Sequence, residues 1–301
     1  MMLLLIAMPG NERLAAAIAQ SGHWEIGALE ARHFPDGESY LRLESVVSGR
    51  SVALICTLAH PDPQILALLF AARLLKENGA RSVHLVAPYL AYMRQDRRFH
   101  DGEALTSRHF AEMLSNVFDG LVTVDPHLHR YHSLSEIYSI PSVALTASPF
   151  LADWARRNVE QPLIIGPDGE SEQWASAIAN AAEAPYTVFT KTRMGDRDVR
   201  VAATELQAWS GRLPVLVDDV ISSGETLADA ARQIVAQGFP PPVCLAVHGL
   251  FSPGADALLA GLGCKVVTTD AVPHRTNAIP LAPLLCEALR AQLGPAAERT
   301  T

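Results

Sequence analysis

Two adjacent aspartates followed by a short polar turn are the residues in this sequence best suited to chemistry. Asp218 and Asp219 come directly after the apolar run 215–217, and Val220 and Ile221 follow them. The turn that leads into a predicted helix consists of Ser222, Ser223, Gly224, Glu225 and Thr226. Hydroxyls and backbone N–H groups at a helix N-terminus bind anions such as a terminal phosphate. The carboxylates would repel a phosphate alone but accept hydrogen bonds from hydroxyls, so the run predicts a sugar-phosphate site.

This interpretation has one alternative and one difficulty. The alternative is that Asp218 and Asp219 only cap a helix in a solvent-exposed loop. The difficulty is Glu225, because a carboxylate facing the site would repel a phosphate. We expect Glu225 to be a first-turn acid of the helix that points away from the site and is stabilised by the helix N-terminus.

The run VLVDDVISSGET at 215–226 resembles a motif that binds phosphoribosyl pyrophosphate. That motif occurs both in type I phosphoribosyltransferases and in ribose-phosphate pyrophosphokinases. Further motifs resemble those of the pyrophosphokinases: FPDGES at 34–39, YLAYMRQDRRF at 89–99, TVDPH at 123–127, TASPFLADW at 146–154 and IGPDGES at 165–171. The resemblance extends from Gly10 to about Leu293. It implies an enzyme that transfers the β,γ-diphosphate of ATP to the anomeric hydroxyl of ribose 5-phosphate, which gives phosphoribosyl pyrophosphate and AMP.

The resemblance also implies roles for individual residues. Lys191 and Arg193 match the family's mobile catalytic residues, which supply positive charge to the transferred diphosphate. His127 and Asp168 match positions associated with Mg²⁺, the expected cofactor. The ribose 5-phosphate site is implied at Asp218, Asp219 and the turn 222–226. The residues implied to bind ATP are Phe34, Asp36, Glu38, Arg94, Gln95 and Asp96.

Within that ATP site, the resemblance implies that Phe34 stacks on the adenine and that Arg94 binds phosphate. In the family the segment around Phe34 can be supplied by a neighbouring subunit, which implies a homodimer or a higher homo-oligomer. The segment 99–110 and the turn 222–225 depart from the common bacterial pattern and are nearer to the archaeal, class III enzymes. These departures favour a dimer or a tetramer over a hexamer.

Other interpretations stay open from the residues alone. The charges around Lys191 are typical of a solvated hairpin, and Pro-Asp-Gly at 35–37 is typical of an ordinary turn. His127, His129 and His132 suggest a zinc site, although matching acidic or thiol partners are missing nearby. A phosphoribosyltransferase, or a non-catalytic regulator of the same fold, would also carry the 215–226 motif.

Composition limits the class of protein. The chain has 301 residues, is 49% hydrophobic and carries a net charge of −8, with no cluster of Lys and Arg for a nucleic-acid surface. No apolar run is long enough to cross a membrane, and the opening MMLLLIAM lacks the basic start and cleavage site of a signal peptide. The four cysteines form no CxxC pair and predict buried thiols in the cytoplasm: Cys56, Cys244, Cys264 and Cys286.

Short apolar runs alternate with helical patterns along the chain. Because the runs are continuously apolar, they predict parallel strands that are covered on both faces. The pattern occurs twice, which with the resemblance predicts an α/β fold of two tandem type I phosphoribosyltransferase-like domains. Each would be a mainly parallel sheet with helices on both faces, with the ATP side and subunit contacts in 1–145 and the ribose 5-phosphate site in 146–301. The predicted strands are 3–8, 52–58, 83–87, 121–124, 163–165, 187–189, 215–217, 243–247 and 266–268, and the predicted helices are 63–78, 107–116, 149–158, 170–181 and 225–237.

Overall fold

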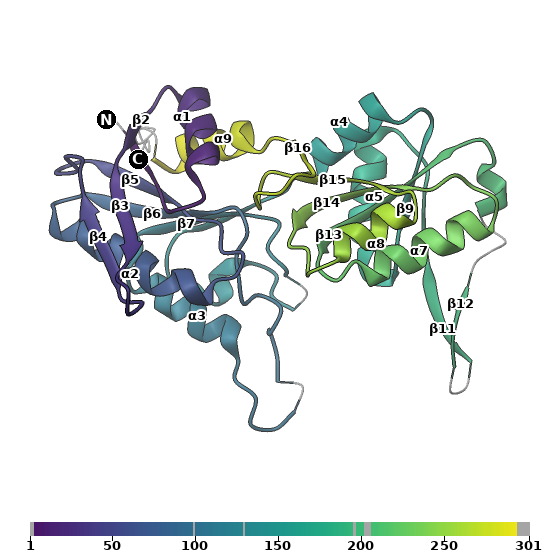
Figure 1. Ribbon diagram of the computed structural model, residues 1–301, viewed down its shortest axis with the longest axis horizontal. Coiled ribbons are helices and arrows are strands. Elements are labelled where there is room, and N and C mark those ends of the chain that lie inside the picture. The colour runs from purple at the N-terminus through teal and green to yellow at the C-terminus, as the bar shows by residue number, and fades with distance from the viewer. Residues whose placement is uncertain (1–2, 99, 129, 195–196, 202–205, 294–301) are drawn as a thin grey trace, which may run out of the picture. The chain divides into compact units, whose positions relative to one another are not determined.

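The chain divides into two compact units (Figure 1). The computed structural model describes residues 3–98, 100–128, 130–194, 197–201 and 206–293, with the backbone alone described for 190–194 and 197–201. Unit 1 contains residues 1–145 together with the segment from Leu281 onward, and unit 2 contains residues 146–280. Each unit is built on a parallel sheet with helices on both faces, so the predicted fold class is confirmed.

Unit 1 has a sheet in which every described neighbouring pair of strands is parallel. Two helices on one face, α1 (Glu12–Gly22) and α9 (Ala282–Leu293), pack together, while α2 (Asp62–Glu77) and α3 (Thr106–Ser115) lie on the other (Figure 1). The strands lie in the order β2 (Glu25–Gly27), β1 (Leu3–Ala7), β5 (Ser51–Ile55), β6 (Ser82–Ala87), β7 (Gly120–Val124) and β8 (Ser142–Leu145). An antiparallel hairpin follows β2 and is formed by β3 (Leu29–His33) and β4 (Ser39–Leu43).

Unit 2 repeats this plan. Its described strands are again all parallel and lie in the order β10 (Tyr186–Val188), β9 (Pro162–Gly166), β13 (Leu213–Ile221), β14 (Val243–Gly249), β15 (Lys265–Thr269) and β16 (Asn277–Ile279). Helices α4 (Ser148–Asn158) and α5 (Glu172–Ala182) cover one face, and α7 (Glu225–Ala236) and α8 (Ala255–Gly261) cover the other. The hairpin of unit 2 is formed by β11 (Thr190–Met194) and β12 (Arg197–Val201) and follows β10.

In both sheets the strand order reverses beside the first strand of the unit. The chain passes from β9 to β10 on one side of β9 and later returns to pair β13 with its other side. The corresponding strands in unit 1 are β1, β2 and β5. At such a reversal point the loops after the two central strands leave in opposite directions, and open α/β sheets bind ligands there.

Two of the predicted bounds that differ from the structure lie beside the reversal point of unit 2. Strand β13 was predicted as 215–217 but continues through Asp218 and Asp219, because Val220 and Ile221 still pair with β14. The helix predicted at 170–181 begins as a 3₁₀ turn, Gly169–Ser171, before α5. Among the described helices, none is long and apolar enough to span a membrane.

The last helix packs differently from the predicted domain 146–301. Helix α9 packs against α1, β7 and β8 of unit 1. The Arg290 guanidinium lies 5.8 Å from the centre of the Trp24 ring and donates a 3.0 Å hydrogen bond to the carbonyl of Ser21. Five side chains of the helix are buried: Ala282, Leu285, Cys286, Ala288 and Leu289. The described end of the chain therefore belongs to unit 1, which makes unit 2 an insertion into unit 1.

We expect Leu285→Ala to destabilise unit 1. Leu285 is fully buried, and truncating a buried leucine costs about 2–5 kcal/mol. Hydrogen exchange should accelerate in α1, β7 and β8 while the sheet of unit 2 keeps its protection. Glu287→Ala, at an exposed position of the same helix, is the control. Faster exchange in unit 2 instead would contradict the placement of α9.

Candidate active site

Three carboxylates lie together at the reversal point of unit 2. Asp218 and Asp219 lie near the end of β13, which continues for two more residues, and Asp168 follows the neighbouring strand β9. Burial, with the nearby negative charges of Asp219 and Asp168, raises the pKa of Asp218 well above its ordinary value. The backbone N–H of Asp219 donates a 2.9 Å hydrogen bond to Oδ1 of Asp218, which opposes the shift without cancelling it. The cluster would therefore be stabilised by a cation or by hydroxyl donors.

The position of Asp168 is set by its own turn. Its Oδ1 accepts hydrogen bonds from the backbone N–H groups of Glu170 (3.1 Å) and Ser171 (3.2 Å), and Ser171 Oγ accepts one from the N–H of Asp168 (3.2 Å). A Cβ at Gly166 would lie 2.6 Å from Ser171 Oγ, so only glycine fits there. This reciprocal cap holds the carboxylate at the end of β9.

The turn after β13 leads into the N-terminus of α7. Gly224 has a φ of +75°, which glycine adopts without strain, and a Cβ there would lie 3.4 Å from the Ala255 carbonyl oxygen. The N–H of Glu225 donates to Ser223 Oγ at 3.4 Å, so part of the helix N-terminus is already satisfied. Ser222 is half-buried, while Ser223, Glu225 and Thr226 are exposed. As expected, Glu225 is an acid of the first helical turn.

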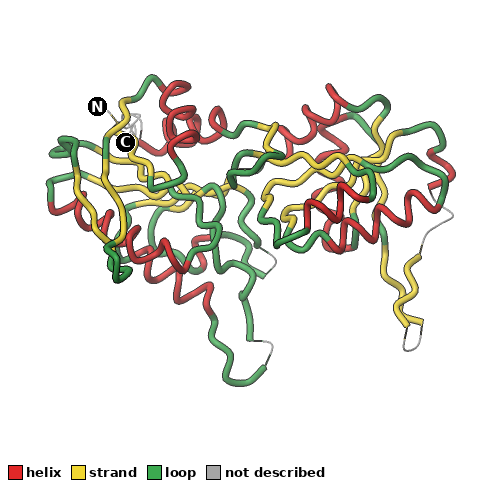
Figure 2. Tube along the Cα trace, viewed as in Figure 1, coloured by secondary structure: helices red, strands yellow, loops and turns green. Residues whose placement is uncertain are grey.

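The predicted catalytic residues Lys191 and Arg193 lie on β11. Their backbones pair with Arg200 and Asp198 across the hairpin, which Figure 2 shows as a long two-stranded ribbon. Because β11 follows β10 directly, the hairpin begins beside β9 and the Asp168 turn. The side chains of Lys191 and Arg193 lie outside what the structure describes, so their roles stay predictions.

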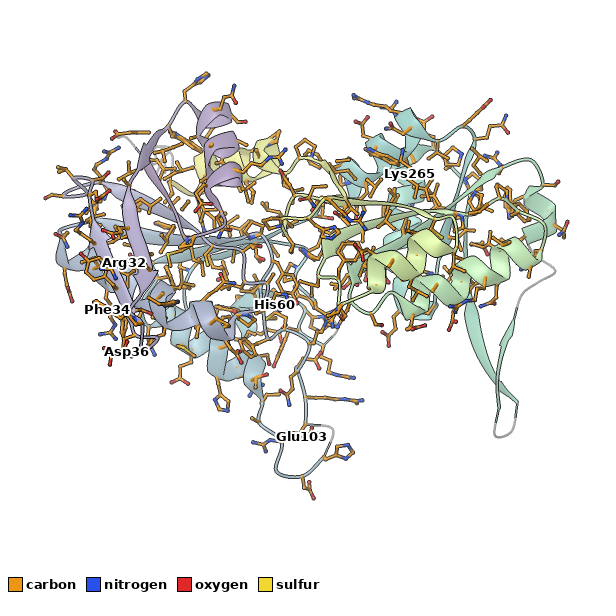
Figure 3. The ribbon with its side chains drawn as sticks, viewed as in Figure 1. Arg32, Phe34, Asp36, His60, Glu103 and Lys265 are labelled. Atoms are coloured by element: carbon orange, nitrogen blue, oxygen red, sulfur yellow. The ribbon has the colours of Figure 1, made fainter. Side chains whose placement is uncertain are left out.

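In unit 1, the segment predicted to bind adenine forms the tip of the β3–β4 hairpin (Figure 3). The backbone N–H of Phe34 donates a 2.8 Å hydrogen bond to the carbonyl of Glu38, and Asp36 Oδ1 accepts one of 3.1 Å from the N–H of Glu38. The Phe34 ring is 40% exposed. The Arg32 guanidinium lies 5.0 Å from the centre of this ring and 4.1 Å from that of Tyr40. The backbone hydrogen bonds of the turn thus hold Phe34 in place while its ring stays exposed.

The other residues predicted to bind ATP lie in the long loop between β6 and α3 (Figure 2). Arg94 is exposed, while Gln95 and Asp96 are half-buried. Gln95 Oε1 accepts a 2.9 Å hydrogen bond from Thr106 Oγ1. The Asp96 side chain is only 6% exposed, and its Oδ1 lies 3.3 Å from Nε of Arg130. Its carboxylate is therefore directed into the protein, toward a partner that the sequence did not indicate.

His127 lies in the loop that follows β7. This loop contains Asp125 with a φ of +40°, and the loop after β6 contains Tyr92 with a φ of +61°. Positive φ is strained for a bulky residue such as Tyr92, and such strain persists where the surrounding structure enforces it. His127 itself is half-buried. Because β6 and β7 are neighbouring parallel strands, both loops leave the same edge of the sheet.

The metal site predicted at His127 and Asp168 involves one residue from each unit. The zinc alternative needs His129, which lies outside the described residues, and so it stays untested. Within the part of the chain that the structure describes, no group of three or more His, Cys, Asp or Glu side chains is arranged to hold a metal ion.

A cavity of about 820 Å³ lies elsewhere in unit 1. It is bounded by the end of β1, helix α1, strand β2 and the β3–β4 hairpin, and Glu12, Glu30, Arg42 and Glu44 contribute its charged groups. Of the described residues that line it, none belongs to the predicted ATP or ribose 5-phosphate sites.

Comparison with known proteins gives consistent matches over most of the chain. A family model for the N-terminal domain of ribose phosphate pyrophosphokinase matches residues 3–117, and a phosphoribosyl transferase domain model matches 133–272. A ribose-phosphate pyrophosphokinase of Methanopyrus kandleri is 30% identical over 95% of this chain and 98% of its own length. One of Saccharolobus solfataricus is 33% identical over 79% and 82%. The crystal structure of a phosphoribosylpyrophosphate synthetase from Mycobacterium smegmatis has the same fold, with a TM-score of 0.84 at 24% identity over 97% of this chain and 99% of that one.

We expect Asp218→Asn to stabilise the protein in the absence of ligands. Because the folded-state pKa of Asp218 is raised, the native state binds the proton more tightly, and its stability falls as the pH rises from the ordinary aspartate range toward the raised value. At neutral pH the asparagine should raise Tm by a few degrees and reduce this pH dependence, as measured by calorimetry.

The same substitution should weaken the binding of ribose 5-phosphate. Glu160→Gln removes an exposed carboxylate from the same unit and should change neither property. A lower Tm for Asp218→Asn at neutral pH would show that repulsion does not dominate this cluster.

Proposed function

Because this chain belongs to the ribose-phosphate pyrophosphokinase family, we propose that it transfers the β,γ-diphosphate of ATP to the anomeric hydroxyl of ribose 5-phosphate. The products are phosphoribosyl pyrophosphate and AMP. The observation that carries the proposal is the carboxylate cluster beside the N-terminus of α7. Asp218 and Asp219 accept hydrogen bonds from the ribose hydroxyls, and the turn 222–226 binds the 5-phosphate through N–H groups and hydroxyls.

Lys191 and Arg193 are proposed as the catalytic residues. In the transfer, an oxygen of the sugar attacks the β-phosphorus of ATP, and negative charge builds on the β-phosphoryl oxygens and on the departing α-phosphate. Fixed cations near these oxygens lower the barrier, because little covalent chemistry is left for the protein in phosphoryl transfer. The β11–β12 hairpin begins directly after β10, and β10 pairs with β9. This position supports placing Lys191 and Arg193 at the edge of the sheet where β9 ends.

Mg²⁺ is proposed as the cofactor. It prefers oxygen ligands, keeps several waters and is usually held by one or two carboxylates together with substrate phosphates. Asp168, which follows β9, offers a carboxylate of this kind. Asp168 and His127 would hold the ion, which neutralises charge on the phosphate oxygens when bound. Burial and the negative charges of Asp219 and Asp168 raise the pKa of Asp218, so a nearby cation would stabilise its ionised form, which supports the fit.

ATP is proposed to bind to the loops of unit 1. Arg94 is exposed and offers its guanidinium to phosphate, and Gln95 contacts the adenine. Phe34 stacks on the adenine, while Asp36 and Glu38 hydrogen-bond to it. The exposure of Phe34 at the tip of a hairpin supports its use by a neighbouring subunit, and hence a homodimer or a higher homo-oligomer.

The cysteines agree with the proposed cytoplasmic location. Cys56, Cys244, Cys264 and Cys286 are all buried and free, as is usual in a reducing compartment.

The test of the function is the formation of AMP. The protein is mixed with ATP, Mg²⁺ and ribose 5-phosphate, and AMP and phosphoribosyl pyrophosphate are quantified. Equal amounts of the two products are expected. Release of pyrophosphate from phosphoribosyl pyrophosphate and a nucleobase, with no AMP from ATP, would identify a phosphoribosyltransferase instead.

We expect Lys191→Ala to lower kcat by about two to three orders of magnitude, as the loss of a group that stabilises transition-state charge does. The affinity for ribose 5-phosphate, measured by calorimetry, should change little. Arg157→Ala removes a positive charge from the exposed surface of α4 and serves as the control. Full turnover by Lys191→Ala would remove this residue from the mechanism.

A further inference from the structure

Two side chains, Tyr131 and Arg130, connect the loop that carries His127 to the loop that carries Gln95. Neither has a part in the mechanism proposed above. Both loops leave the same edge of the unit 1 sheet, since β6 and β7 are neighbouring parallel strands. Strand pairing fixes where the loops begin but not how their distal residues lie. Tyr131 and Arg130 bridge the loops at that distal position.

Tyr131 makes the first connection. Its side chain is buried in the hydrophobic core of unit 1, and its hydroxyl lies 3.2 Å from Ser107 Oγ and 3.4 Å from the carbonyl oxygen of Asp96. A hydroxyl donates only one hydrogen bond. Since Asp96 offers an acceptor, Tyr131 donates to Asp96 and Ser107 donates to Tyr131. The hydroxyl thereby joins the ATP loop to the start of α3.

Arg130 makes the second connection. Its Nε lies 3.3 Å from Oδ1 of Asp96, whose side chain is 6% exposed, whereas the Arg130 side chain is 46% exposed. A pair with one nearly buried partner is screened less by solvent than an exposed pair. Asp96 is thus held through its carbonyl by Tyr131 and through its carboxylate by Arg130.

These contacts act on Gln95 through its neighbour. The carbonyl of Gln95 accepts a 3.4 Å hydrogen bond from the N–H of Ser107, and its Oε1 accepts one from Thr106. With Oε1 engaged, the direction of the Gln95 amide is set by the first turn of α3. Ser107, in the same turn, hydrogen-bonds to Tyr131. The first turn of α3 therefore contacts both Gln95 and the loop that carries His127.

We propose that Tyr131, assisted by Arg130, is a positioning residue that fixes Gln95 and Asp96 relative to the His127 loop. ATP then binds to a preformed edge of unit 1 instead of ordering two independent loops, which would reduce its affinity. The proposal rests on the proposed function, in which these loops bind ATP.

Tyr131→Phe tests the proposal because it removes the hydroxyl and keeps the buried ring. The loss of one or two hydrogen bonds should weaken ATP binding by about three- to tenfold. Calorimetry with Mg²⁺ and ATP, without ribose 5-phosphate, measures this affinity independently of turnover. KM for ATP should rise in the same ratio, while kcat at saturating ATP and the affinity for ribose 5-phosphate change little. Without ligands, hydrogen exchange should accelerate over 94–98 and 100–107.

Tyr138→Phe is the matched control. Tyr138 is buried in the same core, and its hydroxyl has no hydrogen-bond partner among the described residues. The same chemical change there should leave ATP affinity and loop exchange as in the wild type. Ser107→Ala removes one partner of the Tyr131 hydroxyl, and it replaces Tyr131→Phe if that variant does not fold.

Wild-type ATP affinity and wild-type loop exchange in Tyr131→Phe, or in Ser107→Ala when it is the variant used, would overturn the proposal. A loss of affinity that Tyr138→Phe reproduces would do the same. Failure of the proposed function appears differently: the wild type would form no AMP. If ATP still bound and Tyr131→Phe still weakened it, the positioning role would stand without the activity.

Discussion

The burial of neighbouring carboxylates is the constraint on which the candidate site of unit 2 depends. Parallel strands end at the same edge of a sheet, so Asp168 and Asp218 lie close together although fifty residues separate them in the sequence. Holding them there has a cost, which the raised pKa of Asp218 expresses. Buried strands on both sides of β13 and a reciprocal cap at Asp168 prevent the carboxylates from moving apart. The structure thus keeps negative charge where hydroxyls or a cation would relieve it.

The two units share one strand order but place different groups at its reversal point. At the reversal point of unit 1, Asn11 Oδ1 accepts a 2.7 Å hydrogen bond from the N–H of Thr57, and its Nδ2 donates to the carbonyls of Met8 and Pro9. Neutral groups that satisfy one another take the place that charged groups occupy in unit 2. The ligand-binding residues proposed for unit 1 lie instead on its hairpin and on the loops after β6 and β7. The same strand order therefore carries different groups at its reversal point in the two units.

Continuous apolar runs predicted nine of the twelve strands in the two sheets, because most of these strands are buried on both faces and so show no alternation. The edge strands β2, β8 and β16 were missed, since they are short and carry no continuous buried run, and so were the helices α1, α8 and α9. An apolar stripe on a helix shows that the helix is buried but not against which unit, so the end of the chain was predicted in the wrong one. The Asp218–Asp219 pair could be predicted because its residues are adjacent. The contact of Asp96 with Arg130 depends on the paths of two loops, which no local pattern encodes.

The return of α9 to unit 1 has a consequence for how the chain is made. Synthesis proceeds from the N-terminus, so every residue of unit 2 is made before the helix that covers α1. Until then, the side of unit 1 formed by α1, β7 and β8 lacks its cover and exposes apolar surface. The inserted unit can reach its native state while the unit that contains it is still incomplete. Unit 1 therefore needs α9, which is made after unit 2, to cover α1.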